Sequence, residues 1–132
     1  MDAEKVFKNL RLDKAQHILI VDAPPEYDAA LAGYSYDTKP VNAGGYDFVQ
    51  VFAKKQADLE TLLKEVILAC KYDCVLWACY PKGAGKIKSD IKRETVWTAF
   101  DLVNLETVTA VSINDTWSAL RGRPKDAVGR KR

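Results

Sequence analysis

The segment from residue 47 to residue 80 constrains the fold most strongly, because a strand pattern, an amphipathic helix pattern and a second strand pattern follow one another there. Residues 47–53 are rich in β-branched and aromatic side chains, which is typical of a strand. Apolar residues then recur at helical spacing, at positions 59, 62, 63, 66, 67 and 70. Residues 74–79 form a nearly continuous apolar run, which indicates a strand buried on both faces. Two strands joined by a crossover helix pair in parallel, so this segment predicts a parallel α/β unit.

Similar patterns on both sides of this unit predict further strands and helices. Residues 17–21 and 107–113 are typical of strands, and residues 3–10 and 90–104 of helices, the second with Ser89 as its N-cap. A turn at Asn114 and Asp115 before residues 117–121 predicts a terminal hairpin, and a short edge strand is expected within 34–38. The side chains of the second helix that we expect to face the core are Ile91, Val96, Trp97, Phe100 and Val103.

The chain as a whole is expected to form a three-layer α/β sandwich, with a mostly parallel sheet of four or five strands and a terminal hairpin. We assign residues 1–124 to this single domain and residues 125–132 to a basic, flexible tail. A domain of this size can bury enough surface to fold without disulfides or metal. Three cysteines, an odd number, fit a reducing compartment, and no apolar run suits a membrane span or a signal sequence. We therefore expect a cytoplasmic protein that does not bind membranes; the sequence does not indicate its oligomeric state.

Positive charge is concentrated at the end of the chain, where residues 121–132 contain six basic side chains and one acidic side chain. This asymmetry predicts contact with nucleic acid or another anionic surface, through release of counterions. A solvated, frayed terminus explains the same charges, because no aromatic residue follows Trp117. The basic residues are Arg121, Arg123, Lys125, Arg130, Lys131 and Arg132.

The loop after residues 74–79 is the first candidate binding site, since parallel sheets bind ligands beyond the carboxyl ends of their strands. Its glycines allow a ligand to approach the backbone, and the amides at the start of the next helix attract anions. Tyr80 and Ile87 stand where a P-loop requires glycine and a hydroxyl residue, so Walker-type hydrolysis is disfavoured. A surface loop whose lysines are simply solvated would have the same composition. The candidate residues are Lys82, Gly83, Gly85, Lys86, Lys88 and Arg93, with Lys92 beside them.

The turn of the expected hairpin is the second candidate site, and we expect it on the same rim of the sheet. Asp115 would accept a hydrogen bond from a ligand, Trp117 would stack on a flat group, and Arg121 would pair with an anion. In the alternative interpretation these residues only form the turn and cover the end of the sheet. The candidate residues are Asp115, Thr116, Trp117, Ser118 and Arg121.

The loop after the first strand has the sequence Asp22-Ala23-Pro24-Pro25-Glu26, at the place where a dinucleotide fold has its glycines. Its prolines supply no amide donors, so the backbone cannot cradle a pyrophosphate there. Asp22, Glu26 or Asp115 could act as a general acid or base. Acidic residues at the start of a helix have the same pattern without any catalytic role.

Catalysis by an activated nucleophile and metal binding are both disfavoured. His17, the only histidine, opens the first strand and is expected at the end of the sheet opposite to the candidate rim. Cys70, Cys74 and Cys79 do not have the spacing of a zinc site and are expected to be thiols of the core. The sequence identifies no catalytic residue, no metal site and no cofactor.

Two motifs, Tyr80-Pro81-Lys82 and the run from Asp115 to Arg121 with the sequence Asp-Thr-Trp-Ser-Ala-Leu-Arg, carry a resemblance over about residues 10–124. The chain resembles a family of small bacterial proteins of unknown function. Members of that family usually have Arg-Phe-Arg-Pro where this chain has Arg121-Gly122-Arg123-Pro124, so that aromatic residue is absent here. The family has no established activity, and the resemblance therefore implies no catalytic residues.

The order of elements after residue 46 is similar, more distantly, to the second half of the class I methyltransferase fold. That resemblance implies a glycine-rich segment close to S-adenosylmethionine, directly after residues 17–21. Asp22-Ala23-Pro24-Pro25 stands there instead, which implies a derived relative without an intact cofactor site.

These observations lead to one hypothesis and two alternatives. We expect an α/β module that binds an anionic small molecule or partner at the carboxyl-end rim of its sheet. A macromolecular interaction protein that uses the basic tail, with nucleic acid as its partner, is the first alternative. A derived methyltransferase-like protein is the second.

Overall fold

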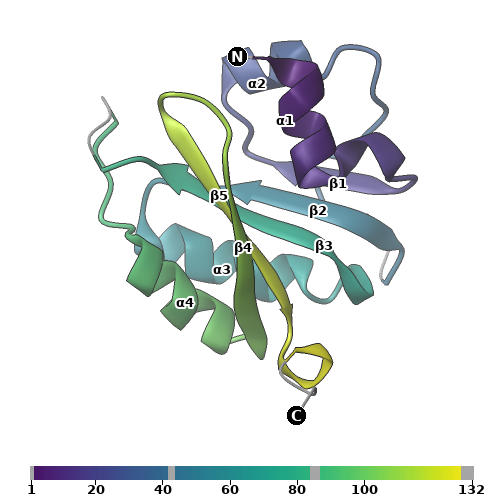
Figure 1. The fold of residues 1–132 in the computed structure, drawn as a ribbon. Helices are drawn as coiled ribbons and strands as arrows, with labels where there is room; N and C mark the ends of the chain where they lie inside the picture. The colour runs from purple at the N-terminus through teal and green to yellow at the C-terminus, as the bar shows by residue number, and fades with distance from the viewer. Residues whose placement is uncertain (1, 42–43, 84–86, 129–132) are drawn as a thin grey trace.

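One five-stranded sheet, in the order β1-β2-β3-β5-β4, organises the molecule (Figure 1). The structure is a computed structural model that describes residues 2–41, 44–83 and 87–128. The strands are β1 (Ile18–Val21), β2 (Tyr46–Phe52), β3 (Cys70–Pro81), β4 (Leu105–Ser112) and β5 (Trp117–Pro124). The helices are α1 (Ala3–Leu10), α2 (Pro25–Ala30), α3 (Gln56–Val66) and α4 (Arg93–Asp101), with two short 3-10 turns, η1 (Leu12–Lys14) and η2 (Lys125–Ala127).

Parallel and antiparallel pairing divide the sheet into two parts. β1, β2 and β3 pair in parallel, whereas β5 pairs antiparallel with both β3 and β4. The predicted fold class is confirmed: the architecture is α/β and the terminal hairpin is present. Since β5 runs opposite to β3, the hairpin turn that precedes β5 lies at the carboxyl end of β3.

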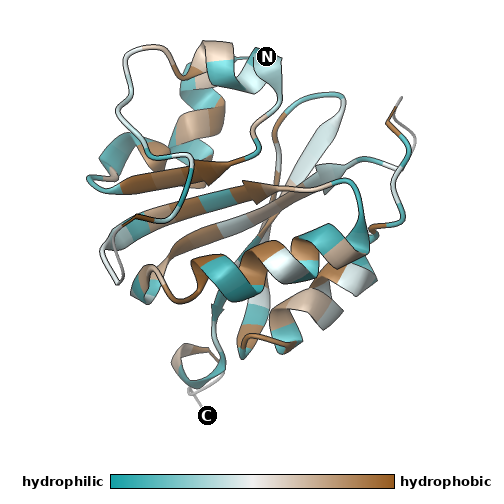
Figure 2. Ribbon diagram, turned by 180° about the vertical axis from the view of Figure 1, so that it is seen from behind, coloured by the Kyte–Doolittle hydropathy of each residue, from teal (hydrophilic) through white to brown (hydrophobic). Residues whose placement is uncertain are grey.

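Helices cover both faces of the sheet and create two cores. α3 and α4 lie on one face, where Leu59 and Phe100 are among the buried side chains. α1 and α2 lie on the other face, where Phe7, Tyr27 and Trp77 are buried. β1 is hydrophobic along its whole length, as Figure 2 shows. This composition suits a strand that is buried between the two helical layers.

The connections of β1 create a point at which the strand order reverses. After α2, the chain returns along the outer edge of β1, where Asp37 forms a single parallel bridge with Leu19. The chain then crosses to β2 on the other side of β1 and continues through α3 to β3. A crevice beyond the carboxyl ends of β1 and β2 is therefore expected, because ligand crevices in open α/β sheets form at such reversals.

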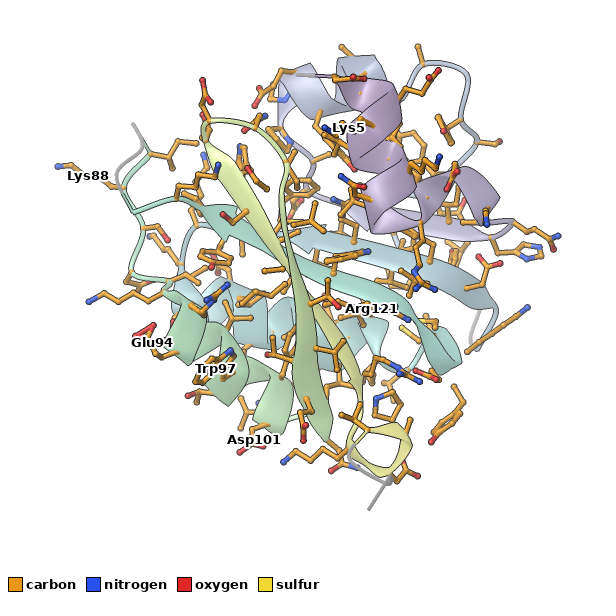
Figure 3. All side chains as sticks on the ribbon, in the orientation of Figure 1. Lys5, Lys88, Glu94, Trp97, Asp101 and Arg121 are labelled. Atoms are coloured by element: carbon orange, nitrogen blue, oxygen red, sulfur yellow. The ribbon has the colours of Figure 1, made fainter. Side chains whose placement is uncertain are left out.

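Some details of the sequence-based predictions are wrong. The fourth helix begins at Arg93, three residues after the predicted start, and Ser89 accepts a 3.0 Å hydrogen bond from the Ile91 amide outside the helix. Trp97 is 51% exposed, because it falls on the outer side of that helix between Glu94 and Asp101 (Figure 3). In place of the expected edge strand within 34–38, the described part of that loop has only the Asp37 bridge.

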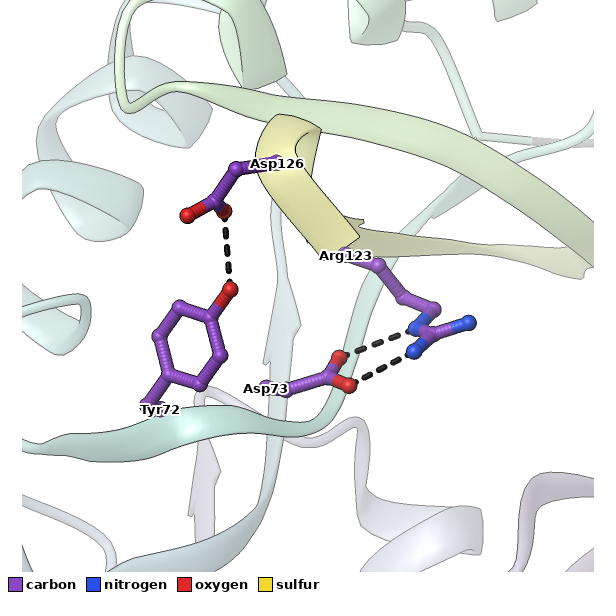
Figure 4. Close-up of polar contacts among 4 residues, drawn as sticks. All are labelled: Tyr72, Asp73, Arg123 and Asp126. Atoms are coloured by element: carbon purple, nitrogen blue, oxygen red, sulfur yellow. Dashed lines mark hydrogen bonds and ion pairs between the residues drawn. The ribbon is translucent and has the colours of Figure 1, made fainter. Parts of the chain in front are cut away.

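The beginning of the expected tail is packed against the domain. η2 follows β5 directly, the Lys125 amide donates to the Asn104 carbonyl, and the Lys125 side chain pairs with Asp101. The Tyr72 hydroxyl donates a 2.8 Å hydrogen bond to Asp126 (Figure 4). Arg130, Lys131 and Arg132 lie outside the described residues. Within the described ranges, no helix has the length and apolar character needed to cross a membrane.

Candidate functional site

The carboxyl end of β3 and the hairpin turn lie side by side, as the sequence predicted. Pro81 is paired with Trp117 across the β3–β5 ladder. One residue further, the Lys82 amide donates a 2.7 Å hydrogen bond to the Thr116 carbonyl. The Lys82 ammonium donates a 2.6 Å hydrogen bond to the Ser112 hydroxyl, at the end of β4. Lys82 is therefore held at the rim by both its backbone and its side chain.

Asn114 gives the hairpin turn its shape. Its side-chain oxygen accepts hydrogen bonds from the amides of Thr116 and Trp117, at 2.8 and 2.9 Å. This is the local side-chain-to-backbone bonding that favours asparagine in turns. Asp115, at the tip of the same turn, is exposed. The Asn114 side chain therefore stabilises the turn. No hydrogen bond of the Asp115 side chain occurs among the residues that the structure describes.

Trp117 covers the end of the sheet instead of projecting from it. Its side chain is only 2% exposed and packs edge-on against Phe52, with ring centroids 5.2 Å apart. Stacking of this indole on a ligand, one of the two sequence interpretations, is therefore disfavoured in this conformation. The Trp117 indole N–H is buried and has no hydrogen-bond partner within the part of the chain that the structure describes.

Arg121 does not lie on the rim, and its expected position there is wrong. It pairs with Trp77 in the middle of β3, four residues along β5 from Trp117, because β5 runs away from the rim. At the usual strand rise this separation is about 13 Å. Figure 3 shows Arg121 over the middle of the sheet, far from Lys88. Burial lowers the pKa of Arg121, and the nearby charge of Arg11 lowers it further.

Two hollows flank Lys82. One, of about 390 Å³, is lined by Lys82, Gly83, Lys88 and Ser89 among others. The other, of about 410 Å³, is lined by Lys82, Lys92 and Arg93, with Tyr80 and Ser118 from the paired strands. We call this second hollow the basic hollow. Gly85 and Lys86 lie outside the described residues, so the structure places the predicted lysine loop only in part.

Asp90, in the segment between the lysine loop and α4, bonds to the start of α3. The Gln56 amide, in the first turn of α3, donates a 2.7 Å hydrogen bond to the Asp90 carboxylate. The first turn of α4 instead lines the basic hollow through Arg93 and Glu94. Amides in the first turn of a helix have no partner within the helix and carry partial positive charge. At the start of α3, Asp90 accepts a hydrogen bond from one of these amides. At the start of α4, the partial positive charge of the helix and the cationic side chains lie beside the same hollow.

A crevice lies where the strand order reverses. It has a volume of about 600 Å³ and extends from the loop after β1 to the first two turns of α3. Its charged lining residues are Asp22, Glu26, Lys54 and Asp58, and its apolar lining includes Pro24, Phe52 and Trp117. We call this the switch-point crevice. Asp22 and Glu26 are candidates in the sequence, but the crevice is not evident there, because its lining comes from elements whose spatial order only the fold defines.

The three cysteine thiols pack within or beside the core. Cys74 and Cys79 are buried, and burial raises the pKa of Cys79 to about 12. Cys70 is half-buried, and hydrogen bonding with Cys74 together with burial raises its pKa. The thiols of Cys70 and Cys79 therefore stay protonated near neutral pH, which agrees with the assignment of the cysteines to the core. No group of three metal-ligating side chains occurs among the residues that the structure describes.

Comparisons with known proteins identify a fold and no family. No family model and no curated protein matches the chain. A SAM-dependent methyltransferase from Aquifex aeolicus is similar with a TM-score of 0.62 and 13% identity, over 92% of this chain and 88% of that one. A putative type 11 methyltransferase from Sulfolobus solfataricus is similar with a TM-score of 0.57 and 15% identity, over 92% and 79%.

A third similar structure contains bound SAH. Magnesium protoporphyrin IX methyltransferase from Synechocystis PCC 6803, with bound SAH, has a TM-score of 0.59 and 9% identity, over 92% of this chain and 81% of that one. At these identities the likeness shows the fold alone. The chain therefore has a methyltransferase-like α/β fold, in agreement with the more distant of the two resemblances.

The residues after β1 do not fit S-adenosylmethionine, the cofactor that the more distant resemblance implies. Pro24 and Pro25 follow the strand at the point where the resemblance implies glycines, and a proline has no amide to donate. Pro25 then begins α2, which is only six residues long. Pro24 and Pro25 therefore remove two backbone donors from the place where the resemblance implies a glycine-rich segment close to S-adenosylmethionine.

Proposed function

We propose that this protein is a methyltransferase-like α/β module that binds an anionic small molecule in the basic hollow. Lys82, Lys92 and Arg93 would supply positive charge, and Ser118 would supply a hydroxyl hydrogen-bond donor. The ligand group would be a phosphate, a sulfate or a carboxylate, since each accepts charge-assisted hydrogen bonds from such side chains.

The double attachment of Lys82 is the observation that carries this proposal. Its backbone is bonded to Thr116 and its ammonium to Ser112. A lysine that is already ordered loses less side-chain entropy when it binds an anion than a freely moving lysine does. Its ammonium has further donors beyond the one that Ser112 accepts.

The other groups of the hollow support an anion. Burial raises the pKa of Tyr80, so its hydroxyl stays protonated at neutral pH and can donate a hydrogen bond. Among the described lining residues, Glu94 is the only acid against three cations. The first turn of α4 adds the partial positive charge of a helix start. The three cations, the hydroxyl and the helix start all favour a negatively charged ligand.

Thermal unfolding with inorganic pyrophosphate tests this proposal. We expect pyrophosphate to raise the Tm of the wild-type protein and a Lys82→Ala, Arg93→Ala double variant to lose most of that increase. The matched control is Lys5→Ala, Lys14→Ala, which removes the same charge from exposed positions in α1 and η1. An equal Tm increase in both double variants, or none in the wild type, would exclude the site.

A derived methyltransferase-like protein without a cofactor site is the second candidate. The fold similarity favours it, together with the prolines after β1. Isothermal titration with SAH tests this candidate, and we expect no binding at about 1 mM ligand, a concentration chosen well above typical cofactor affinities of roughly micromolar order. Saturable binding of SAH would show that the cofactor site is intact.

A further inference from the structure

We propose that the switch-point crevice is a separate binding site for a small organic cation with a flat apolar body. Its position is the first reason. Asp22 and Pro24 follow β1, and Phe52 ends β2, so the crevice lies beyond two parallel strands at the reversal of strand order. Open α/β sheets bind their ligands at this place.

The apolar lining of the crevice determines the body of the ligand. Pro24 contributes from the loop between β1 and α2, Phe52 from the end of β2 and Leu62 from α3. The volume of about 600 Å³ is within the range of small-molecule sites. Aromatic and proline side chains present flat apolar surfaces, and aromatic faces also attract cations. An aromatic or similarly flat ligand suits this lining.

The charges of the crevice determine the sign of the ligand. Asp22, Glu26 and Asp58 face one cation, Lys54, among the lining residues that the structure describes. Glu26 and Asp58 also lie in the first turns of α2 and α3, where acids stabilise helices. Asp22 belongs to neither helix: it directly follows β1 and has a φ of 60°. The net charge of the lining is negative, which disfavours phosphates and favours an ammonium or amidinium group.

Trp117 adds a donor that lacks a partner. It lines the crevice, its side chain is 2% exposed, and its indole N–H is unbonded among the described residues. A buried donor without an acceptor destabilises the folded state, because its hydrogen bond to water is lost and not replaced. A ligand that carries an acceptor as well as a cation would supply the partner that this N–H lacks among the described residues.

This site is independent of the proposed anion site. Ile87 lines both the crevice and the smaller hollow beside Lys82, so it separates regions of opposite charge. The basic hollow shares no charged residue with the crevice. Substitutions in one site can therefore be tested without altering the other.

Three probes with the same phenyl group test the assignment by isothermal titration calorimetry: phenethylamine, 2-phenylethanol and 3-phenylpropionate. We expect the amine to bind at least tenfold more tightly than the alcohol and the carboxylate not to bind measurably. An Asp22→Asn, Asp58→Asn double variant should lose at least tenfold in affinity for the amine. Asparagine tolerates the positive φ of residue 22, so this variant is expected to fold.

The matched control is Asp13→Asn, Glu65→Gln, which removes two exposed acids outside the crevice and should change the affinity less than twofold. Absence of amine binding at about 10 mM, a concentration above the range of weak small-molecule affinities, would overturn the proposal. Equal binding of the three probes, or displacement of the amine by SAH, would overturn it as well. Binding of pyrophosphate is measured separately, so this proposal and the proposed function can fail independently.

Discussion

The Lys82 ammonium and the Ser112 hydroxyl form a 2.6 Å hydrogen bond that joins the end of β3 to the end of β4, across the start of β5. These residues are 30 positions apart in the sequence and come together because both β4 and β5 belong to the terminal hairpin. The bond fixes a positive charge beside the basic hollow. It links the topology of the sheet to the proposed anion site.

Replacing Ser112 with alanine should weaken anion binding without unfolding the protein. Ser112 is exposed, so the free energy of unfolding should change by less than about 1 kcal/mol. Lys82 would lose its acceptor, and ordering it on binding would cost more entropy, which predicts a loss in pyrophosphate affinity of about two- to fivefold. Isothermal titration measures this loss. Ser35→Ala, at an exposed position of the described loop before β2, is the control.

Replacing Asp90 with alanine should destabilise the start of α3. The carboxylate accepts from the Gln56 amide at 2.7 Å, and loss of such a cap costs about 1 kcal/mol. Asp90→Asn retains an oxygen acceptor and should cost less than half as much. Urea denaturation of both variants provides the comparison. Equal stability of the two would show that the hydrogen bond does not stabilise α3.

Replacing Gly122 with alanine should overpack the core under α4. A methyl group at this position would lie 3.0 Å from the Phe100 ring, which is fully buried. Such overpacking costs about 1–3 kcal/mol. Gly83→Ala is the control, because a methyl group there meets no atom within 4 Å. Chemical denaturation should distinguish the two variants, and equal stability would contradict the close approach of Phe100 to β5.

The ion pair between Asp73 and Arg123 should make stability depend on pH in the acidic range. Arg123 donates two hydrogen bonds to the Asp73 carboxylate, at 2.9 and 2.6 Å (Figure 4). This pairing holds the pKa of Asp73 below its ordinary value of 3.8. The stabilisation is therefore complete above pH 3.8 and is lost as the pH falls through the lower pKa of the folded state.

The Arg123→Gln variant tests this linkage. Both side chains are partly exposed, so the pair should contribute only about 0.5–1 kcal/mol at pH 7. The difference in the free energy of unfolding between wild type and variant should shrink as the pH falls below 3.8. A difference that stays constant down to about pH 2 would show that packing, and not charge, explains it. Asp73 itself is unsuitable for substitution by alanine, because its φ is 56°.

The order of strand and turn patterns along the sequence is sufficient to predict the strands, and to predict that Lys82 and the hairpin turn lie at the same edge of the sheet. The apolar run at 74–79 and the turn at Asn114 determine which loops follow which strands, and antiparallel return of β5 then brings Thr116 beside Lys82. The predicted position of Arg121 is wrong because counting from the turn ignores the direction of β5. The predicted burial of Trp97 is wrong because its helix position faces solvent, although large aromatic side chains usually favour the core.

The switch-point crevice could not be predicted from periodicity. Its lining combines Asp22, Asp58 and Trp117, which come from three separated segments, and their proximity depends on the order of β1 and β2. The sequence does contain a signal, since prolines replace the glycines expected after β1. That signal disfavours one ligand class but does not locate a site. Strand order alone supplies the location.

Titration of ¹⁵N-labelled protein with inorganic pyrophosphate tests the central claim most directly, because amide shifts report where the anion binds. Saturable shifts should concentrate at the amides of Lys82, Gly83, Arg93 and Ser118, around the basic hollow. They should be much smaller in the Lys82→Ala, Arg93→Ala variant. Saturable shifts that cluster elsewhere, or no saturable shifts in the wild-type protein, would contradict anion binding at this rim.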